Sequence, residues 1–127
     1  MRGGKVLLAR SEGDLHFQIP GGKIEPGETD VQALVRETKE ELALSLDAEQ
    51  ATYLDTFAAP AAGRADVFVE VRLYEADIAA EPRASSEIAE LIWQEPAHPT
   101  VACSDVVSLH ILPYLVRRSH GTGDIDA

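Results

Sequence analysis

The sequence is poor in cysteine and in aromatic residues. It has one Cys among 127 residues, and Phe, Trp and Tyr together make up 6%. Cys103 cannot form an internal disulfide, which fits a reducing compartment, and we interpret it as a buried thiol rather than a catalytic one. The core must therefore be built mainly from Val, Leu, Ile and Ala.

Positive charge is also scarce. The chain has 11 Lys and Arg residues against 22 Asp and Glu residues, which gives a formal net charge of −11. Such a chain repels a nucleic-acid backbone, so we expect no duplex DNA or RNA partner. Phosphate chemistry is still compatible with this charge if carboxylates hold divalent cations, because the cations reverse the local field.

Long hydrophobic runs are absent from the sequence. No run approaches the length that spans a bilayer, and the apolar residues 6–9 are too few for a signal peptide. We therefore expect a cytoplasmic protein without membrane contact. The length and the 45% hydrophobic content allow one domain. We place this domain at residues 1–118, followed by a polar, flexible tail at residues 119–127.

Turn and periodicity signals place strands and helices along this domain. Five segments have the composition or the alternation of β-strands: residues 4–10, 15–19, 52–58, 67–74 and 88–94. Thr29 and Gln32 form a capping-box pattern at the start of a helix. A second helix is expected after Ser104 as its N-cap, with a kink at Pro113. This order predicts a mixed α/β (α+β) sandwich rather than a regular doubly wound sheet.

The segment after residue 20 combines a glycine-rich loop with three carboxylates. On the expected helix, Glu37, Glu40 and Glu41 are spaced i, i+3 and i+4, so they share one face and repel one another. Hard divalent cations with oxygen ligands would relieve this repulsion. A solvated helix face is the alternative interpretation, and it is the usual one for an isolated E-x-x-E-E pattern. A Walker P-loop is excluded, because Ile24 follows Lys23 where Ser or Thr is required.

Residues 22–44 closely resemble the Nudix box, G-x5-E-x7-R-E-U-x-E-E-x-G-U, in which U is a bulky aliphatic residue. Seven positions match at the required spacing: Gly22, Glu28, Arg36, Glu37, Glu40, Glu41 and Leu44. Thr38 replaces the first aliphatic residue and Ala43 replaces the glycine, which bears on the packing and the end of the helix. The resemblance, which extends over residues 5–116, implies a small MutT-like Nudix hydrolase with an α/β/α sandwich and a mixed β-sheet.

The resemblance also implies Mg²⁺ or Mn²⁺ as the cofactor. The metal would be bound by Glu37, Glu40, Glu41 and the carbonyl group of Gly21, and a metal-activated water would attack a diphosphate. The substrate would be a nucleotide-like small molecule, namely a nucleoside diphosphate linked to another moiety. A nucleoside triphosphate and a nucleotide sugar such as ADP-ribose both fit this description.

Loop residues receive roles by the same resemblance. Arg36 and Glu28 would organise the loop and the helix as one unit. Gly22 and Lys23 would lie at the phosphates, although a solvated Lys23 fits the sequence equally well.

The proton acceptor of the implied reaction is a glutamate. Glutamates bound to the metal are poor bases, because the cation stabilises their charged form. Glu37 of the box and the later Glu87 and Glu90 are the candidates. We favour Glu90, because it lies nearer to Trp93, where a strand can fix its direction.

A non-catalytic Nudix-like nucleotide-binding module is the alternative function. The complete set of box carboxylates argues against it, because a pure binder does not need all of them. Members of the family usually have a further strand ahead of residue 4. Its absence would leave an exposed sheet edge, so we predict a homodimer.

Overall fold

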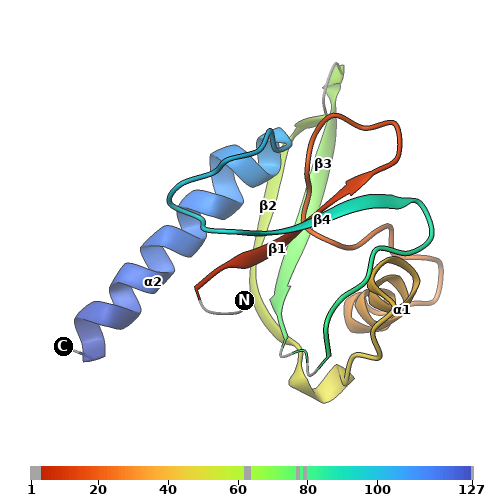
Figure 1. The fold of residues 1–127 in the computed structure, drawn as a ribbon, viewed down its shortest axis with the longest axis horizontal. Helices are drawn as coiled ribbons and strands as arrows, with labels where there is room; N and C mark the ends of the chain where they lie inside the picture. The colour runs from red at the N-terminus through yellow and green to blue at the C-terminus, as the bar shows by residue number, and fades with distance from the viewer. Residues whose placement is uncertain (1–3, 62–63, 77, 79, 127) are drawn as a thin grey trace.

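The computed structural model describes residues 4–61, 64–76, 78 and 80–126. Its main elements are β1 (Val6–Ser11), α1 (Asp30–Leu42), β2 (Thr52–Ala61), β3 (Arg64–Glu75), β4 (Ile88–Gln94) and α2 (Leu112–Asp126) (Figure 1). A 3₁₀ turn (Ala48–Gln50) precedes β2, and a π-helical segment (Val106–Ile111) precedes α2. The α/β class predicted from the sequence is therefore confirmed.

The strands form two separate antiparallel pairs, β1 with β4 and β2 with β3. The single mixed sheet that we predicted is not formed in the described part of the chain. The expected strand at residues 15–19 makes only isolated bridges, from Gln18 to Ala9 and from Phe17 to Cys103. Each of these two residues bridges to a different segment, so no continuous ladder of hydrogen bonds forms along residues 15–19.

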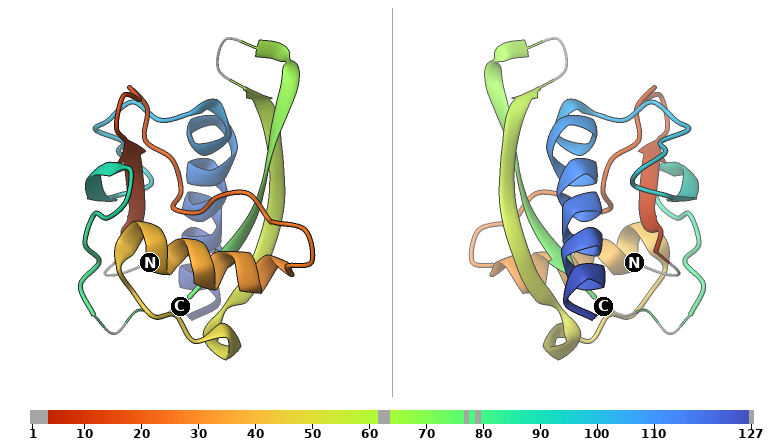
Figure 2. Two further views of the ribbon diagram at one scale, coloured as in Figure 1. Left: turned by 90° about the vertical axis from the view of Figure 1, so that its right-hand side faces the viewer. Right: turned by 90° about the vertical axis from the view of Figure 1, so that its left-hand side faces the viewer.

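The two helices cover opposite sides of these strands. Figure 2 shows α1 in front of the strands in one view and α2 in front of them in the opposite view. The layers are therefore α/β/α, as predicted. Among the described residues, no helix combines the length and the hydropathy that are needed to cross a bilayer.

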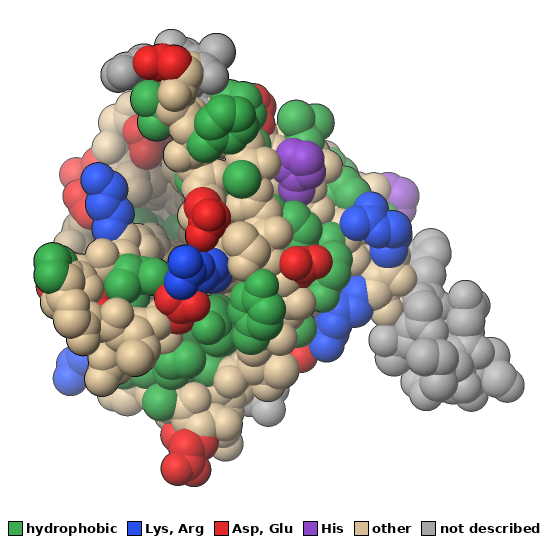
Figure 3. All heavy atoms as spheres, turned by 180° about the vertical axis from the view of Figure 1, so that it is seen from behind, with side chains coloured by type: hydrophobic (Ala, Val, Ile, Leu, Met, Phe, Trp, Pro, Cys, Tyr) green, Lys and Arg blue, Asp and Glu red, His purple; other side chains and the backbone are tan. Residues whose placement is uncertain are grey.

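The main core lies between α2, the π-helical segment and both strand pairs. Leu8, Val107 and Ile111 are fully buried at its centre. Cys103 packs at the edge of this cluster and is only partly buried, and this burial raises the pKa of its thiol. Hydrophobic side chains also reach the surface, where they lie beside acidic and basic ones on the face shown in Figure 3.

The second helix begins differently from the prediction. The Oγ atom of Ser104 is buried and has no hydrogen-bond partner among the described residues, so the predicted side-chain cap is wrong. Instead, the Ser104 carbonyl accepts a bond from the Ser108 N–H group at 2.9 Å. The Leu112 N–H group bonds to Val107 five residues back, which places a π-type irregularity just before Pro113.

The second helix also ends later than predicted. It extends to Asp126, so residues 119–126 have helical backbone geometry and are not a tail outside regular structure. The Arg118 guanidinium bonds to the Glu75 carboxylate at 3.1 Å and ties the helix to β3. Adding residues to a helix that already exists costs little, because each one gains a backbone hydrogen bond. Residue 127 lies outside the described part, and the domain boundary at residue 118 stays a prediction.

Candidate active site

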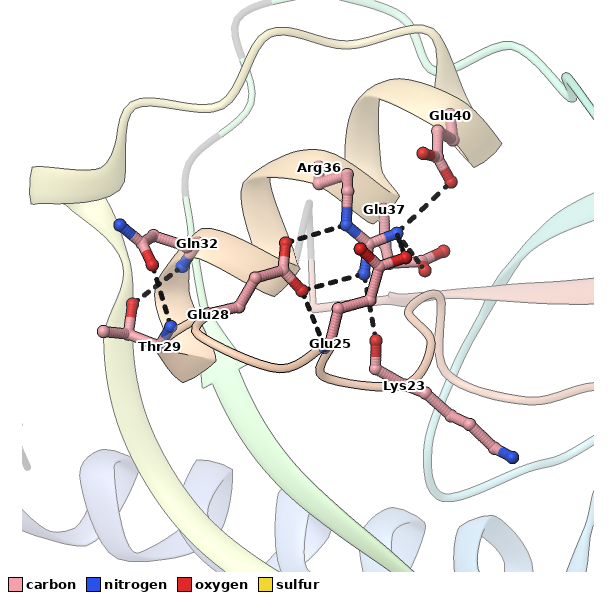
Figure 4. A network of polar contacts seen from close by, with 8 residues as sticks. All are labelled: Lys23, Glu25, Glu28, Thr29, Gln32, Arg36, Glu37 and Glu40. Atoms are coloured by element: carbon pink, nitrogen blue, oxygen red, sulfur yellow. Dashed lines mark hydrogen bonds and ion pairs between the residues drawn. The ribbon is translucent and has the colours of Figure 1, made fainter.

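A capping box fixes the start of α1, which carries the box glutamates. Thr29 Oγ1 accepts a bond from the Gln32 N–H group at 3.1 Å, and Gln32 Oε1 accepts one from the Thr29 N–H group at 2.9 Å (Figure 4). This is the predicted pattern, and it satisfies two backbone donors at the end of the helix. The cap therefore sets which side chains of α1 face the preceding loop.

Arg36 joins the loop to the helix. Its Nε and Nη2 atoms donate to the two carboxylate oxygens of Glu28 at 2.8 and 3.0 Å, and Nη2 also donates to the Lys23 carbonyl at 2.9 Å (Figure 4). The hydrogen bond from Arg36 lowers the pKa of Glu28, and the same contact raises the pKa of Arg36. These are the organising contacts that the resemblance implied.

The loop lies directly against Glu37. A Cβ atom on Gly22 would be 2.5 Å from the Cδ and Oε1 atoms of Glu37, so a residue with a side chain at position 22 would displace that carboxylate. Arg36 Nη1 holds the same carboxylate at 2.7 Å. The exposed side chain of Lys23 points away from this network in Figure 4, so only its backbone takes part.

Glu41 is the buried carboxylate of the group, with 9% of its surface exposed. The alternative interpretation, a solvated helix face, therefore does not hold for Glu41. Burial raises the pKa of Glu41 to about 7, a hydrogen bond of 2.8 Å from the Gly21 N–H group opposes the rise, and the charges of Glu37, Glu87 and Glu40 add to it. Gly21 thus lies at Glu41 as expected, but the contact uses its N–H group rather than its carbonyl. A carboxylate in these surroundings would gain from a bound cation.

The donor set fits a hard divalent cation, because every candidate ligand is an oxygen. In the described part of the chain, however, no three acidic, His or Cys side chains already converge as a metal cluster. Arg36 Nη1 lies 2.7 Å from Glu37 and 3.5 Å from Glu40, so it occupies oxygens that a cation would use. Metal binding would therefore compete with Arg36 for Glu37.

The two later glutamates have different surroundings. On β4, the Glu90 carboxylate accepts bonds from Arg10 at 3.2 and 3.3 Å, because Arg10 and Glu90 are paired in the β1–β4 register. Glu87 precedes the strand, and its charge contributes to the raised pKa of Glu41. The electrostatic influence of Glu87 on Glu41, and the ion pair that holds Glu90, thus favour Glu87 as the loop glutamate at the site, which is the reverse of our preference. Its catalytic role stays a prediction.

One cavity lies beside Glu41, and a second cavity adjoins it. The first, of about 100 Å³, is lined by Glu41, Gly21, Ser11, His16 and Gln18 among others. The second, of about 170 Å³, shares His16 and Gln18 with the first and continues to other elements. Its lining includes Leu15, Pro60, Val69, Ser104 and Asp105. His16 and Gln18 were not among the residues predicted from the sequence, although their alternation with the buried Phe17 could have indicated a shared face.

Residues 1–110 match the NUDIX domain family. The chain belongs to this family. It is 44% identical over 52 residues to the asymmetrical bis(5′-nucleosyl)-tetraphosphatase of Sus scrofa, a match that covers 41% of this chain. The chain spans about a third of the length of that relative, 34%.

Two solved structures resemble the chain over most of its length. The E. coli ORF135 protein is 30% identical, with a TM-score of 0.57, and the match covers 76% of this chain and 68% of that one. A MutT NUDIX hydrolase from Burkholderia pseudomallei is 23% identical, with a TM-score of 0.70, and the match covers 92% of this chain and 89% of that one. The second likeness supports the α/β Nudix fold alone.

Proposed function

We propose that the protein is a Mg²⁺-dependent pyrophosphohydrolase that cleaves the diphosphate of a nucleoside diphosphate linked to another moiety. The observation that carries the proposal is the environment of Glu41. This carboxylate is buried beside Gly21, and the charges of three further glutamates raise its pKa. A structure that tolerates this accumulation of negative charge is better explained by a cation site than by a solvated helix face.

The residues of the site divide the work. Glu37, Glu40 and Glu41 would hold the metal, which when bound supplies charge neutralisation and an activated water at the diphosphate. Glu87 takes the proton from the attacking water, because it lies outside the helix that holds the cation. Arg36 and Glu28 keep the loop against α1.

The adjoining cavity gives room for the nucleoside. It leads away from Glu41 through His16 and Gln18, and Leu15 and Val69 supply apolar surface for a base. Gln18 and Asp105 supply polar groups that can bind the edge of a base. Nucleoside triphosphates and nucleotide sugars such as ADP-ribose are the candidate substrates. The name of the Sus scrofa relative adds dinucleoside tetraphosphates to them.

A turnover assay over these three substrate classes tests the proposal. Products of diphosphate cleavage should appear with Mg²⁺ and not with a chelator. Glu41→Gln should lose activity by orders of magnitude, whereas Glu49→Gln, which changes an exposed glutamate outside the Nudix box, should match the wild type. Tight binding of a nucleotide without turnover in wild-type protein would instead favour the non-catalytic module.

A further inference from the structure

The loop that precedes β4 passes beside the C-terminal end of α1 (Figure 1). The Arg83 N–H group donates to the Leu42 carbonyl at 2.9 Å, and the Ser85 N–H group donates to the Glu41 carbonyl at 3.0 Å. The last carbonyl groups of a helix have no partner within the helix, so the loop supplies donors that this helix end needs. The loop is thereby attached to the backbone of Glu41 itself.

Ser86 lies in a tight turn that follows this attachment. The Ile88 N–H group donates to the Ser85 carbonyl at 3.1 Å and closes the turn, and Ser86 has a φ of +57°. Turns that need a positive φ at this position normally carry Gly, Asn or Asp, so a serine is strained there. Backbone strain of this kind persists only where the surrounding structure holds it, and it gathers at functional sites.

Glu87 is held by its backbone on the other side of the turn as well. Its carbonyl accepts a bond of 2.8 Å from the Glu12 N–H group, next to the point where Ser11 pairs with Ile88 at the end of β1. The side chain of Glu87 is exposed, yet its charge contributes to the raised pKa of Glu41. The backbone around Glu87 therefore decides where this carboxylate lies relative to Glu41.

We propose that Ser86 is a positioning residue, whose left-handed backbone conformation holds Glu87 in place beside Glu41. This inference rests on the proposed function, in which Glu41 binds the metal and Glu87 takes the proton from the attacking water. The two glutamates are joined by one backbone hydrogen bond, from Ser85 to Glu41, and by the turn at Ser86. A different φ at residue 86 would redirect the Glu87 side chain.

Substitutions at residue 86 test the proposal through the backbone alone, because the Ser86 side chain is exposed. Val strongly disfavours a positive φ, whereas Gly adopts it freely. Ser86→Val should lower kcat by at least about 10-fold and leave KM and the Mg²⁺ requirement nearly unchanged. Ser86→Thr, which is also β-branched, should show a smaller loss, and Ser86→Gly should retain most of the wild-type kcat. The matched control is Ser45→Val, at an exposed serine without a positive φ, and it should match the wild type.

A double variant separates positioning from a general structural effect. If Ser86 acts through Glu87, adding Ser86→Val to Glu87→Gln should lower kcat by less than about 2-fold further, because the group that is positioned has already been removed. Independent effects would instead multiply. Multiplied losses would overturn the proposal, as would a kcat of Ser86→Val equal to that of the wild type.

Hydrogen exchange gives a readout that does not depend on turnover. Ser86→Val should speed the exchange of the Glu12, Ser85 and Ile88 amides by at least about 10-fold and spare the Arg83 amide, which bonds to α1 ahead of the turn. Ser86→Gly should leave all four amides protected. Unchanged exchange in Ser86→Val would overturn the proposal, and the proposed function would still stand. Absence of turnover by the wild type on all three substrate classes would overturn the proposed function, and the positioning role would fall with it.

Discussion

Gly22 and Glu37 are packed so closely that a Cβ atom on Gly22 would lie 2.5 Å from the Glu37 carboxylate. The contact joins the first residue of the Nudix box to a glutamate fifteen positions later in the chain. It explains in steric terms why this loop carries glycine at position 22. The atoms in conflict are the far end of a flexible side chain, so the carboxylate can move aside, but it then leaves the place where Arg36 holds it.

We therefore predict that Gly22→Ala reduces activity more than stability. Displacement of Glu37 should lower kcat/KM by at least about 10-fold, because small misplacements of catalytic groups are costly. The melting temperature should change by only a few degrees. Lys23→Ala, which removes an exposed side chain from the next position, is the matched control and should retain most of the activity. Equal turnover by Gly22→Ala and wild type would show that the position of Glu37 is unimportant.

The second prediction concerns Glu41 and pH. The pKa of this carboxyl is raised from 4.5 to about 7, so the folded chain favours the protonated form. Its contribution to stability is therefore complete below about pH 4.5, declines as the pH rises to about 7, and is lost above that. The loss amounts to about 3 kcal/mol at most. Without metal, Glu41→Gln should be more stable than wild type at pH 8 and similar to it at pH 4.5.

Melting curves with and without Mg²⁺ check the direction of this stability difference between Glu41→Gln and the wild type. Mg²⁺ should stabilise the wild type at pH 8, because a ligand of the folded state raises stability by mass action, and it should stabilise Glu41→Gln much less. Glu49→Gln controls for the loss of an exposed charge. If Glu41→Gln is the less stable protein at pH 8 in the presence of a chelator, the charged form of Glu41 is not destabilised by its burial and by the neighbouring glutamates.

The loop–helix unit could be predicted from the sequence because it depends on local spacing. The capping box of Thr29 and Gln32 and the contact between Arg36 and Glu28 both join residues fewer than ten positions apart. Periodicity likewise located most of the strands. These features need no knowledge of how distant segments meet.

The features that the sequence analysis missed depend on long-range pairing. Arg10 meets Glu90 only through the β1–β4 register, and this contact reverses our ranking of the two later glutamates. His16 and Gln18 reach the site because their segment bridges to Ala9 and to Cys103. The orphaned hydroxyl of Ser104 follows from the π-helical start of the second helix, which no local pattern signalled.

The end of α1 supplies a third prediction. Ala43 has φ 56° and ψ 34°, so it adopts the left-handed conformation, and its N–H group bonds to the Lys39 carbonyl at 3.1 Å. Ala is strained there and Gly is not, so Ala43→Gly should stabilise the protein by about 1 kcal/mol. Ala33→Gly, at a buried position in the first turn of the same helix, should destabilise it. A clear fall in the melting temperature of Ala43→Gly would contradict the assigned helix end.

The last prediction separates Glu87 from Glu90. Glu87→Gln should lower kcat by roughly 100-fold or more at saturating Mg²⁺, which is the usual loss when a general base is removed, and should leave KM nearly unchanged. The acidic limb of the pH profile of kcat should disappear with it, which a merely structural residue would not cause. Glu90→Gln breaks an exposed ion pair with Arg10, a contact worth at most about 1 kcal/mol, and should keep near-normal turnover. A large loss in Glu90→Gln with none in Glu87→Gln would restore the order expected from the sequence. Full activity in both variants would leave Glu37 as the proton acceptor, since it is the remaining candidate close to Glu41.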